Sequence, residues 1–150
     1  MTKKILVFDM DGTIANFYGV ENWLNDLINE NTRPYEIAEP IYEPNEINTI
    51  LNELKKIGYK IVITTWLSQN GSVEYANRTR QAKLNWLKKY GFPYDEIHLV
   101  KYGTTKANCT RKLGGFQILF DDNEKVRQGW NLGATVNANE NIMEYLKRLV

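Results

Sequence analysis

Polar side chains suited to metal binding or acid–base chemistry follow three short apolar runs of this 150-residue sequence. Asp9-Met10-Asp11-Gly12-Thr13 follows the run at residues 5–8, Thr64-Thr65 follows residues 61–63, and Asp121-Asp122 follows residues 118–120. Carboxylate oxygens bind hard divalent cations, and carboxylates also act as nucleophiles or as general acids and bases. If the fold brings these groups together, the sequence predicts one catalytic site.

The apolar runs alternate with longer segments of helical periodicity. Short runs rich in β-branched residues predict strands at residues 5–8, 61–63, 97–100, 116–120 and 134–136. Helical patterns are found at residues 45–57, about 72–90 and 105–112, around Val126 and Trp130, and over the last residues of the chain. This alternation predicts an α/β fold, a doubly wound and mostly parallel sheet with helices on both faces. Ligands bind such sheets at the carboxyl ends of the strands, which is where the polar groups would lie.

Each polar group also has a purely structural interpretation. An aspartate after a strand often caps a helix, and Asp-Gly is a common turn. The threonines would then satisfy backbone groups, and Asp121-Asp122-Asn123 would cap the next helix. All of these explanations would have to hold at three strand ends at once, so we favour the functional interpretation.

The predicted arrangement crowds the carboxylates of Asp9, Asp11 and Asp121 into one small place. Carboxylates that close repel and raise one another's pKa unless a cation neutralises them. Mg²⁺ is the cation expected here, because it needs few carboxylates and accepts water and phosphate as its other ligands. Lys106 would add a positive charge to the same pocket. Carboxylates, a cation, a lysine and a hydroxyl together predict a site for phosphoryl chemistry.

In their order along the chain, these groups resemble the four motifs of the haloacid dehalogenase-like (HAD) phosphohydrolase superfamily. Asp9-Met10-Asp11-Gly12-Thr13 resembles the first motif and Ile61-Val62-Ile63-Thr64 the second. Lys106 resembles the third motif, and Asp121-Asp122 resembles the fourth. The resemblance spans nearly the whole chain and implies a HAD-like Rossmannoid core.

The resemblance also implies a role for each motif residue. Asp9 would be the nucleophile that forms an aspartyl-phosphate, and Asp11 would be the general acid and base. The dehalogenase branch lacks a carboxylate at the position of Asp11, so its presence favours phosphoester chemistry. Mg²⁺ would be held by Asp9, by the backbone carbonyl of Asp11 and by Asp121. Asp122 would reach the metal through water or orient its neighbours. Thr64 and Lys106 would bind the phosphoryl oxygens.

Two of these assignments have alternatives. Thr65 would replace Thr64 if the strand ended one residue later, because a shift of one residue reverses the face of each side chain. Lys101 competes with Lys106 for the third motif. We favour Lys106 because it could open the helical segment at residues 105–112, whereas Lys101 directly follows a strand.

Composition and charge set the remaining expectations. A length of 150 residues predicts a single domain over residues 1–150, and a net charge of +1 argues against a dedicated nucleic-acid coat. One cysteine, Cys109, excludes an intramolecular disulfide framework, and no apolar stretch approaches the ~20 residues of a membrane span. We therefore expect a cytoplasmic protein without a membrane segment and without an obligate protein partner.

Residues 14–44 interrupt the alternation and predict a small insertion, a minimal cap in HAD terms. One weak helical pattern lies near Trp23 and Leu27, and three prolines follow. Phe17, Trp23 and Trp66 lie near the predicted site, where aromatic faces could stack on a nucleobase or instead form the insertion's own core. Thr64-Thr65-Trp66 and Asp121-Asp122 also resemble the 5′(3′)-deoxyribonucleotidase branch, although the cap is much shorter here.

We therefore predict a Mg²⁺-dependent phosphomonoester hydrolase acting on a small-molecule phosphomonoester, a nucleotide, or a nucleic-acid terminal phosphate. The alternatives are an open-site HAD phosphatase acting on phosphoprotein or small sugar phosphates, and a non-catalytic HAD-fold scaffold. An intact set of Asp9, Asp11, Lys106 and Asp121 argues against the scaffold.

Overall fold

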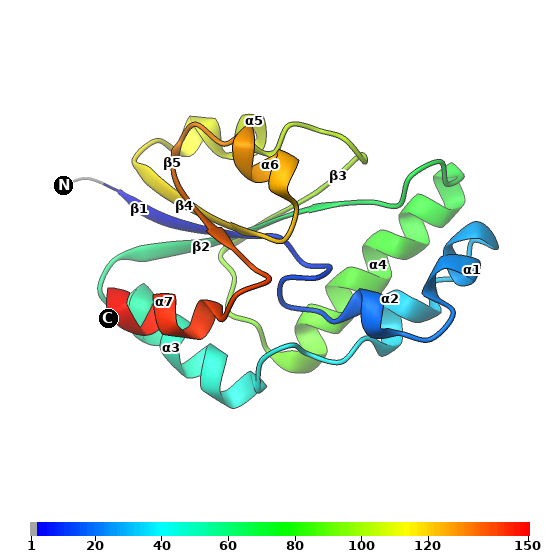
Figure 1. The fold of residues 1–150 in the computed structure, drawn as a ribbon, viewed down its shortest axis with the longest axis horizontal. Helices are drawn as coiled ribbons and strands as arrows, with labels where there is room; N and C mark the ends of the chain where they lie inside the picture. The colour runs from blue at the N-terminus through cyan, green and yellow to red at the C-terminus, as the bar shows by residue number, and fades with distance from the viewer. Residues whose placement is uncertain (1–2) are drawn as a thin grey trace.

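Five parallel strands form the centre of the computed structural model, which describes residues 3–150 (Figure 1). The strands are β1 (Lys4–Phe8), β2 (Tyr59–Trp66), β3 (Glu96–Val100), β4 (Phe116–Asp121) and β5 (Gly133–Asn137). The longer helices are α3 (Pro44–Lys56), α4 (Val73–Tyr90) and α7 (Ile142–Leu149). The shorter ones are α1 (Trp23–Ile28), α2 (Arg33–Ile37), α5 (Lys106–Thr110) and α6 (Glu124–Gln128), with 3₁₀ turns η1 (Phe17–Gly19) and η2 (Arg111–Leu113).

The strand order is β3-β2-β1-β4-β5, which confirms the predicted doubly wound parallel sheet. The chain winds outward from β1 through β2 to β3 and then returns to β4 on the other side of β1. In register, Phe8 pairs with Ile63 on one side and with Phe120 on the other. The polar residues that follow these three positions therefore emerge at one edge, beside the point where the winding reverses.

Side chains along β1 alternate between two hydrophobic cores. Leu6 and Phe8 pack in the core that includes apolar residues of α3 and α7, and Ile5 and Val7 pack with Ala107 of α5 on the opposite face. Figure 1 shows these layers, with α3 and α7 on one side of the sheet and α5 and α6 on the other. Burial on both faces explains why the central strands are continuous apolar runs rather than alternating ones.

The long helices begin and end where local signals place them. Ser72 accepts a hydrogen bond from the Tyr75 N–H at the start of α4, and Gly91 ends that helix with a φ of 69°. Of the helices described over residues 3–150, none has the length and apolar character required to cross a membrane.

One predicted helix was confirmed and another was wrong in extent. The segment predicted as helical at residues 105–112 is helical in the structure, as α5 followed directly by the 3₁₀ turn η2. Trp130 lies beyond the end of α6, although Val126 is on it. Its indole N–H donates to the Gln117 carbonyl of β4 at 3.2 Å, so packing against the sheet places this side chain rather than helical periodicity.

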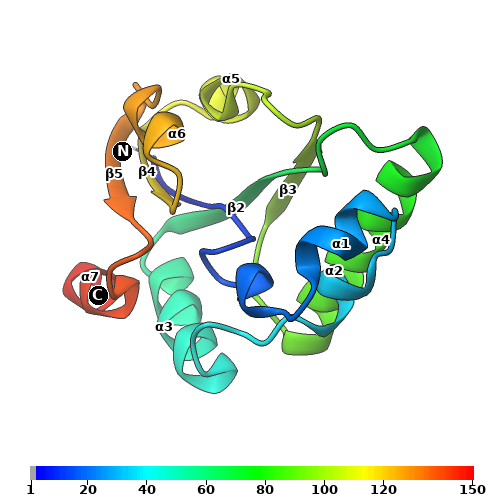
Figure 2. The same cartoon turned by 45° about the vertical axis from the view of Figure 1, so that its right-hand side comes forward.

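Residues 14–44 form a small helical layer beside α4 (Figure 2). The layer contains α1, where the sequence predicted a helical pattern, and also α2, which the sequence analysis missed. Pro34 stands in the first turn of α2, where the absence of an N–H costs no hydrogen bond, so this proline starts a helix instead of breaking one. The role of this insertion as a cap stays a prediction.

Phe8 holds the centre of the sheet together directly below the predicted site. Its ring stacks on Phe120 of β4 at 4.6 Å between centroids and meets the edge of Phe92 at 5.5 Å. We expect Phe8→Ala to lower the free energy of unfolding by about 3–5 kcal/mol, the usual cost of removing a buried phenylalanine ring. Urea denaturation followed by circular dichroism measures this loss.

The matched control is Phe116→Ala at the opposite end of β4, where the side chain is 50% exposed. This change should cost less than about 1 kcal/mol. Similar losses in the two variants would contradict the packing described here.

Candidate active site

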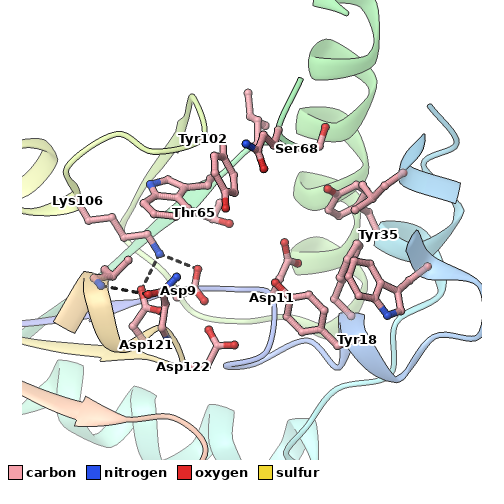
Figure 3. Close-up of a pocket in the computed structure, with 18 of the residues that line it drawn as sticks. Asp9, Asp11, Tyr18, Tyr35, Thr65, Ser68, Tyr102, Lys106, Asp121 and Asp122 are labelled. Carbon is pink, nitrogen blue, oxygen red and sulfur yellow. Dashed lines mark hydrogen bonds and ion pairs between the residues drawn. The ribbon is translucent and has the colours of Figure 1, made fainter. Parts of the chain in front are cut away.

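Three aspartates converge at the carboxyl edge of the sheet. Asp9 directly follows β1, Asp121 is the last residue of β4, and Asp122 is the next residue along. One carboxylate oxygen from each of the three lies within 4.8 Å of the others. Figure 3 shows these side chains gathered below Lys106. Lys106 is the first residue of α5, which follows the loop after β3. The parallel register therefore produces the cluster that the sequence predicted from its strand ends.

Lys106 joins the two buried aspartates of this cluster. Its Nζ donates to Asp9 Oδ1 at 2.8 Å and to Asp121 Oδ2 at 2.7 Å, and the side chain is almost completely buried. Burial alone would lower the pKa of Lys106, but the charges of Asp9 and Asp121 outweigh it and raise that pKa above the value of a free lysine. Lys101 is exposed, so the structure brings Lys106 and not Lys101 to the cluster.

The remaining carboxylate oxygens of Asp9 and Asp121 are held by nearby donors. The Thr13 hydroxyl donates to Asp9 Oδ2 at 3.2 Å, and the Asn123 N–H donates to Asp121 Oδ1 at 2.9 Å. Both aspartates thus have fixed orientations before any ligand binds, as a preorganised site requires.

The donor set fits a divalent cation. When all three carboxylates are ionised, the one ammonium of Lys106 leaves two negative charges in a largely buried place. Hard oxygen donors favour Mg²⁺, which tolerates water and phosphate as further ligands. The carboxylate of Asp11 does not belong to the cluster. Its predicted part in metal binding, through the backbone carbonyl, is compatible with that placement.

Gly12 permits the close approach of Asp122. It has a φ of +82°, a conformation that side-chain-bearing residues rarely adopt, and a Cβ at this position would overlap Asp122 Oδ2. The glycine of the first motif is therefore required by the shape of the site and not only by the turn that it forms.

Asp11 points away from the cluster toward α4 and meets a residue that the sequence analysis missed. Lys83 Nζ donates to Asp11 Oδ2 at 3.0 Å, to Thr65 Oγ1 at 2.7 Å and to the Trp66 carbonyl at 2.8 Å. Burial raises the pKa of Asp11, with opposition from Lys83 and a further increase from Asp9. The sequence offers one weak signal for Lys83, because this residue lies at helical spacing from the apolar residues Trp86 and Leu87, which the structure buries on the same side of α4.

The two threonines of β2 face opposite sides of the sheet. Thr65 lines the cavity above the cluster, whereas Thr64 is completely enclosed and its hydroxyl has no hydrogen-bond partner among the described residues. The geometry therefore favours Thr65 over Thr64 as the second-motif hydroxyl, because β2 continues to Trp66 and each step along a strand changes the face.

An aromatic cavity of about 320 Å³ lies over the carboxylates. Its aromatic walls come from the insertion, from the last residue of β2 and from the loop after β3: Phe17, Tyr18, Trp23, Tyr35, Trp66 and Tyr102. Phe17 is buried and packs on Tyr35 with 4.7 Å between ring centroids, so it forms the insertion's own core as well as one wall. Trp66 is oriented by its indole N–H, which donates to the Thr104 carbonyl at 2.8 Å. The three aromatic residues that the sequence singled out, Phe17, Trp23 and Trp66, thus all line this cavity.

Comparisons with known proteins agree with the architecture. No protein-family model and no curated protein matches the chain. A chain of the Pnkp1/Rnl/Hen1 RNA repair complex is similar, with a TM-score of 0.60 and 20% identity over 91% of this chain and 43% of that one. D,D-heptose 1,7-bisphosphate phosphatase from Burkholderia thailandensis is similar with a TM-score of 0.51 and 19% identity, over 88% of this chain and 75% of that one.

The chain therefore shares the fold of these two structures, a parallel α/β sheet with helices on both faces, which is the fold that the resemblance to the HAD superfamily predicted. It spans less than half the length of the RNA repair chain and three quarters of the heptose bisphosphate phosphatase. The likeness establishes the fold, and the 5′(3′)-deoxyribonucleotidase branch stays a prediction.

Binding of Mg²⁺ should depend on pH because protons compete for the same oxygens. Burial and the charge of Asp9 raise the pKa values of both Asp121 and Asp122, so these carboxyls hold protons well above the ordinary range. Since Mg²⁺ binds only the ionised forms, its affinity should fall as the pH is lowered from about 8 to about 6. Isothermal titration calorimetry in buffers of different ionisation enthalpy measures the affinity and the protons released.

Asp121→Asn should weaken Mg²⁺ binding at least about tenfold, since it removes a ligand charge. Glu124→Gln removes one charge from an exposed position three residues away and should leave the affinity almost unchanged. Equal affinities for the wild type and the Asp121→Asn variant would exclude the cluster as the metal site.

Proposed function

We propose that this protein is a Mg²⁺-dependent phosphomonoester hydrolase that works through an aspartyl-phosphate on Asp9. The observation that carries the proposal is the cluster of Asp9, Asp121 and Asp122, with Lys106 bonded to two of them, beneath an open aromatic cavity. Phosphoryl transfer needs positioning and charge stabilisation more than any other help from the protein, and this arrangement supplies both.

In the first step, a carboxylate oxygen of Asp9 attacks phosphorus while the bond between phosphorus and the leaving oxygen breaks. Asp11 gives its proton to that oxygen, so the product leaves as a neutral alcohol. Burial keeps the pKa of Asp11 above that of an ordinary aspartate, which favours the protonated form that this step requires. Lys106 and Thr65 stand where they can bind phosphoryl oxygens.

In the second step, water attacks phosphorus and gives a proton to the Asp11 carboxylate. The bond between phosphorus and Asp9 breaks, inorganic phosphate leaves, and both aspartates return to their starting states. A Mg²⁺ ion held by Asp9, Asp121 and Asp122 would neutralise charge on the transferring group. Lys106 keeps Asp9 oriented and reduces the repulsion that an anionic substrate meets.

The aromatic cavity favours a nucleotide or the terminal phosphate of a nucleic acid as substrate. Stacking of one base on an aromatic side chain contributes about 1–3 kcal/mol, and Trp66 and Tyr102 offer adjacent rings with centroids 4.9 Å apart. Similarity to a chain of an RNA repair complex supports this substrate class.

Small sugar phosphates form a second candidate class, favoured by the similarity to a heptose bisphosphate phosphatase. A screen for released phosphate separates the two classes. Its substrates would be 5′- and 3′-nucleotides, end-phosphorylated oligonucleotides, sugar phosphates and a phosphopeptide.

Asp9→Asn tests whether the chain is an enzyme. We expect wild-type protein with Mg²⁺ to hydrolyse p-nitrophenyl phosphate, and the variant to lose activity by about a thousandfold or more, because the amide is a poor nucleophile. Release of p-nitrophenolate is followed by absorbance, with chelation of Mg²⁺ and the Glu124→Gln variant as controls. Equal rates for wild type and Asp9→Asn would leave the non-catalytic scaffold as the better description.

Trp66→Ala tests the substrate class. Loss of one stacking surface should raise KM for a preferred nucleotide by about tenfold or more, with a much smaller change for a small sugar phosphate. Steady-state kinetics on both substrates gives the comparison, and Tyr94→Ala, outside the cavity, is the control. A parallel change for both substrates would contradict base stacking at Trp66.

A further inference from the structure

Lys83 is a buried charge that none of the four motifs explains. It lies in the middle of α4 with its side chain 1% exposed, and burial of a lysine is costly unless the ammonium is fully hydrogen-bonded. Its three N–H donors meet this requirement with three acceptors, Asp11 Oδ2, Thr65 Oγ1 and the Trp66 carbonyl. A long apolar side chain would fill the same space without this cost, so the charge itself calls for an explanation.

Two of these three acceptors belong to the end of β2, and the third is the side chain of Asp11. Lys83 therefore ties the loop after β1 to the neighbouring strand and to α4. Its Nζ also lies 5.2 Å from the centre of the Tyr35 ring, so the insertion, to which Tyr35 belongs, packs on the Lys83 ammonium as well. No other ion pair involves the Asp11 carboxylate among the described residues.

We propose that Lys83 is a positioning residue for proton transfer by Asp11. The inference rests on the proposed function. Lys83 holds Oδ2 of Asp11, which leaves the other carboxyl oxygen for the leaving group of a substrate in the cavity that Asp11 lines. When Asp11 gives up its proton as the bond from phosphorus to the leaving oxygen breaks, the new carboxylate already faces an ammonium at 3.0 Å.

This assignment separates the tasks of the two buried lysines. Lys106 contacts Asp9, the proposed nucleophile, and Asp121, a proposed metal ligand. Lys83 contacts Asp11 but neither Asp9 nor Asp121. Lys83 also holds the hydroxyl of Thr65, but a role of Thr65 in phosphate binding would be the same for every phosphomonoester. A defect at Lys83 that acts through Asp11 should therefore appear as a selective loss on substrates whose leaving group needs a proton.

Two substrates that differ in their leaving groups provide the test. p-Nitrophenolate leaves readily without a proton, whereas the alkoxide of benzyl phosphate needs one from a general acid. The value of kcat/KM reports only steps up to the departure of this group. For Lys83→Met we expect kcat/KM to fall at least about tenfold more on benzyl phosphate than on p-nitrophenyl phosphate, a part of the 10²–10⁴-fold that general acids contribute.

The ratio of the two kcat/KM values within one preparation does not depend on how much of the protein is folded. A purely structural role for Lys83 would therefore leave the ratio unchanged. Lys83→Gln, which removes the charge and keeps a polar donor, is measured in the same way, so a failure of Lys83→Met to fold does not end the test. Lys88→Met, at an exposed position of the same helix, is the matched control and should behave as wild type.

A double-mutant cycle identifies the residue through which Lys83 acts. In an Asp11→Asn background, Lys83→Met should not change the ratio further, because the proton donor is already absent. An additional selective loss on benzyl phosphate in that background would overturn the proposal, and so would equal losses on the two substrates in the single variant. If wild-type protein hydrolysed neither substrate, the proposed function would fail and this inference with it.

Discussion

Charge balance at the carboxyl edge of the sheet is the constraint on which the site depends. The register of β1 against β4 places Asp9 beside Asp121, and Asp122 approaches because Gly12 has no side chain. Buried carboxylates this close are stable only with compensating charge, and Lys106 supplies one unit of it through hydrogen bonds to two of the three. With all three carboxylates ionised, negative charge remains in excess, and this excess would attract a divalent cation and, with the cation bound, a phosphoryl group.

Much of this site was predictable because the relevant signals are local. A buried strand followed at once by an acid places that acid at a known edge of a parallel sheet, so Asp9 and Asp121 followed from periodicity alone. The choice between Thr64 and Thr65 could not be made from periodicity, because it depends on whether β2 stops or continues for one more residue. Lys83 depends on tertiary packing across 72 residues of chain, and a lysine in a polar helix such as α4 is normally assigned to its exposed face.

In the insertion too, local sequence patterns predicted some features, and others depended on tertiary packing. The pattern near Trp23 and Leu27 predicted α1, but α2 was hidden by Pro34, which occurs both in loops and in the first turn of helices. Aromatic residues here had been given two interpretations, a small core and a ligand wall. The structure shows that these are compatible, because Phe17 packs on Tyr35 and the same cluster borders the cavity.

The cavity has two kinds of wall, and this difference bears on how a substrate would be held. Tyr35 packs near Lys83 and is anchored through it to Asp11, so the wall formed by the insertion is tied to the proposed proton donor. Trp66, at the end of β2, and Tyr102, on the loop after β3, form the other wall, and Tyr102 is 46% exposed. A substrate's phosphate would then sit at the rigid base while the rest of the molecule lies between the rings. Because the insertion is small and the far wall is exposed, such a site does not need to enclose its substrate, which suits the end of a longer chain as well as a single nucleotide.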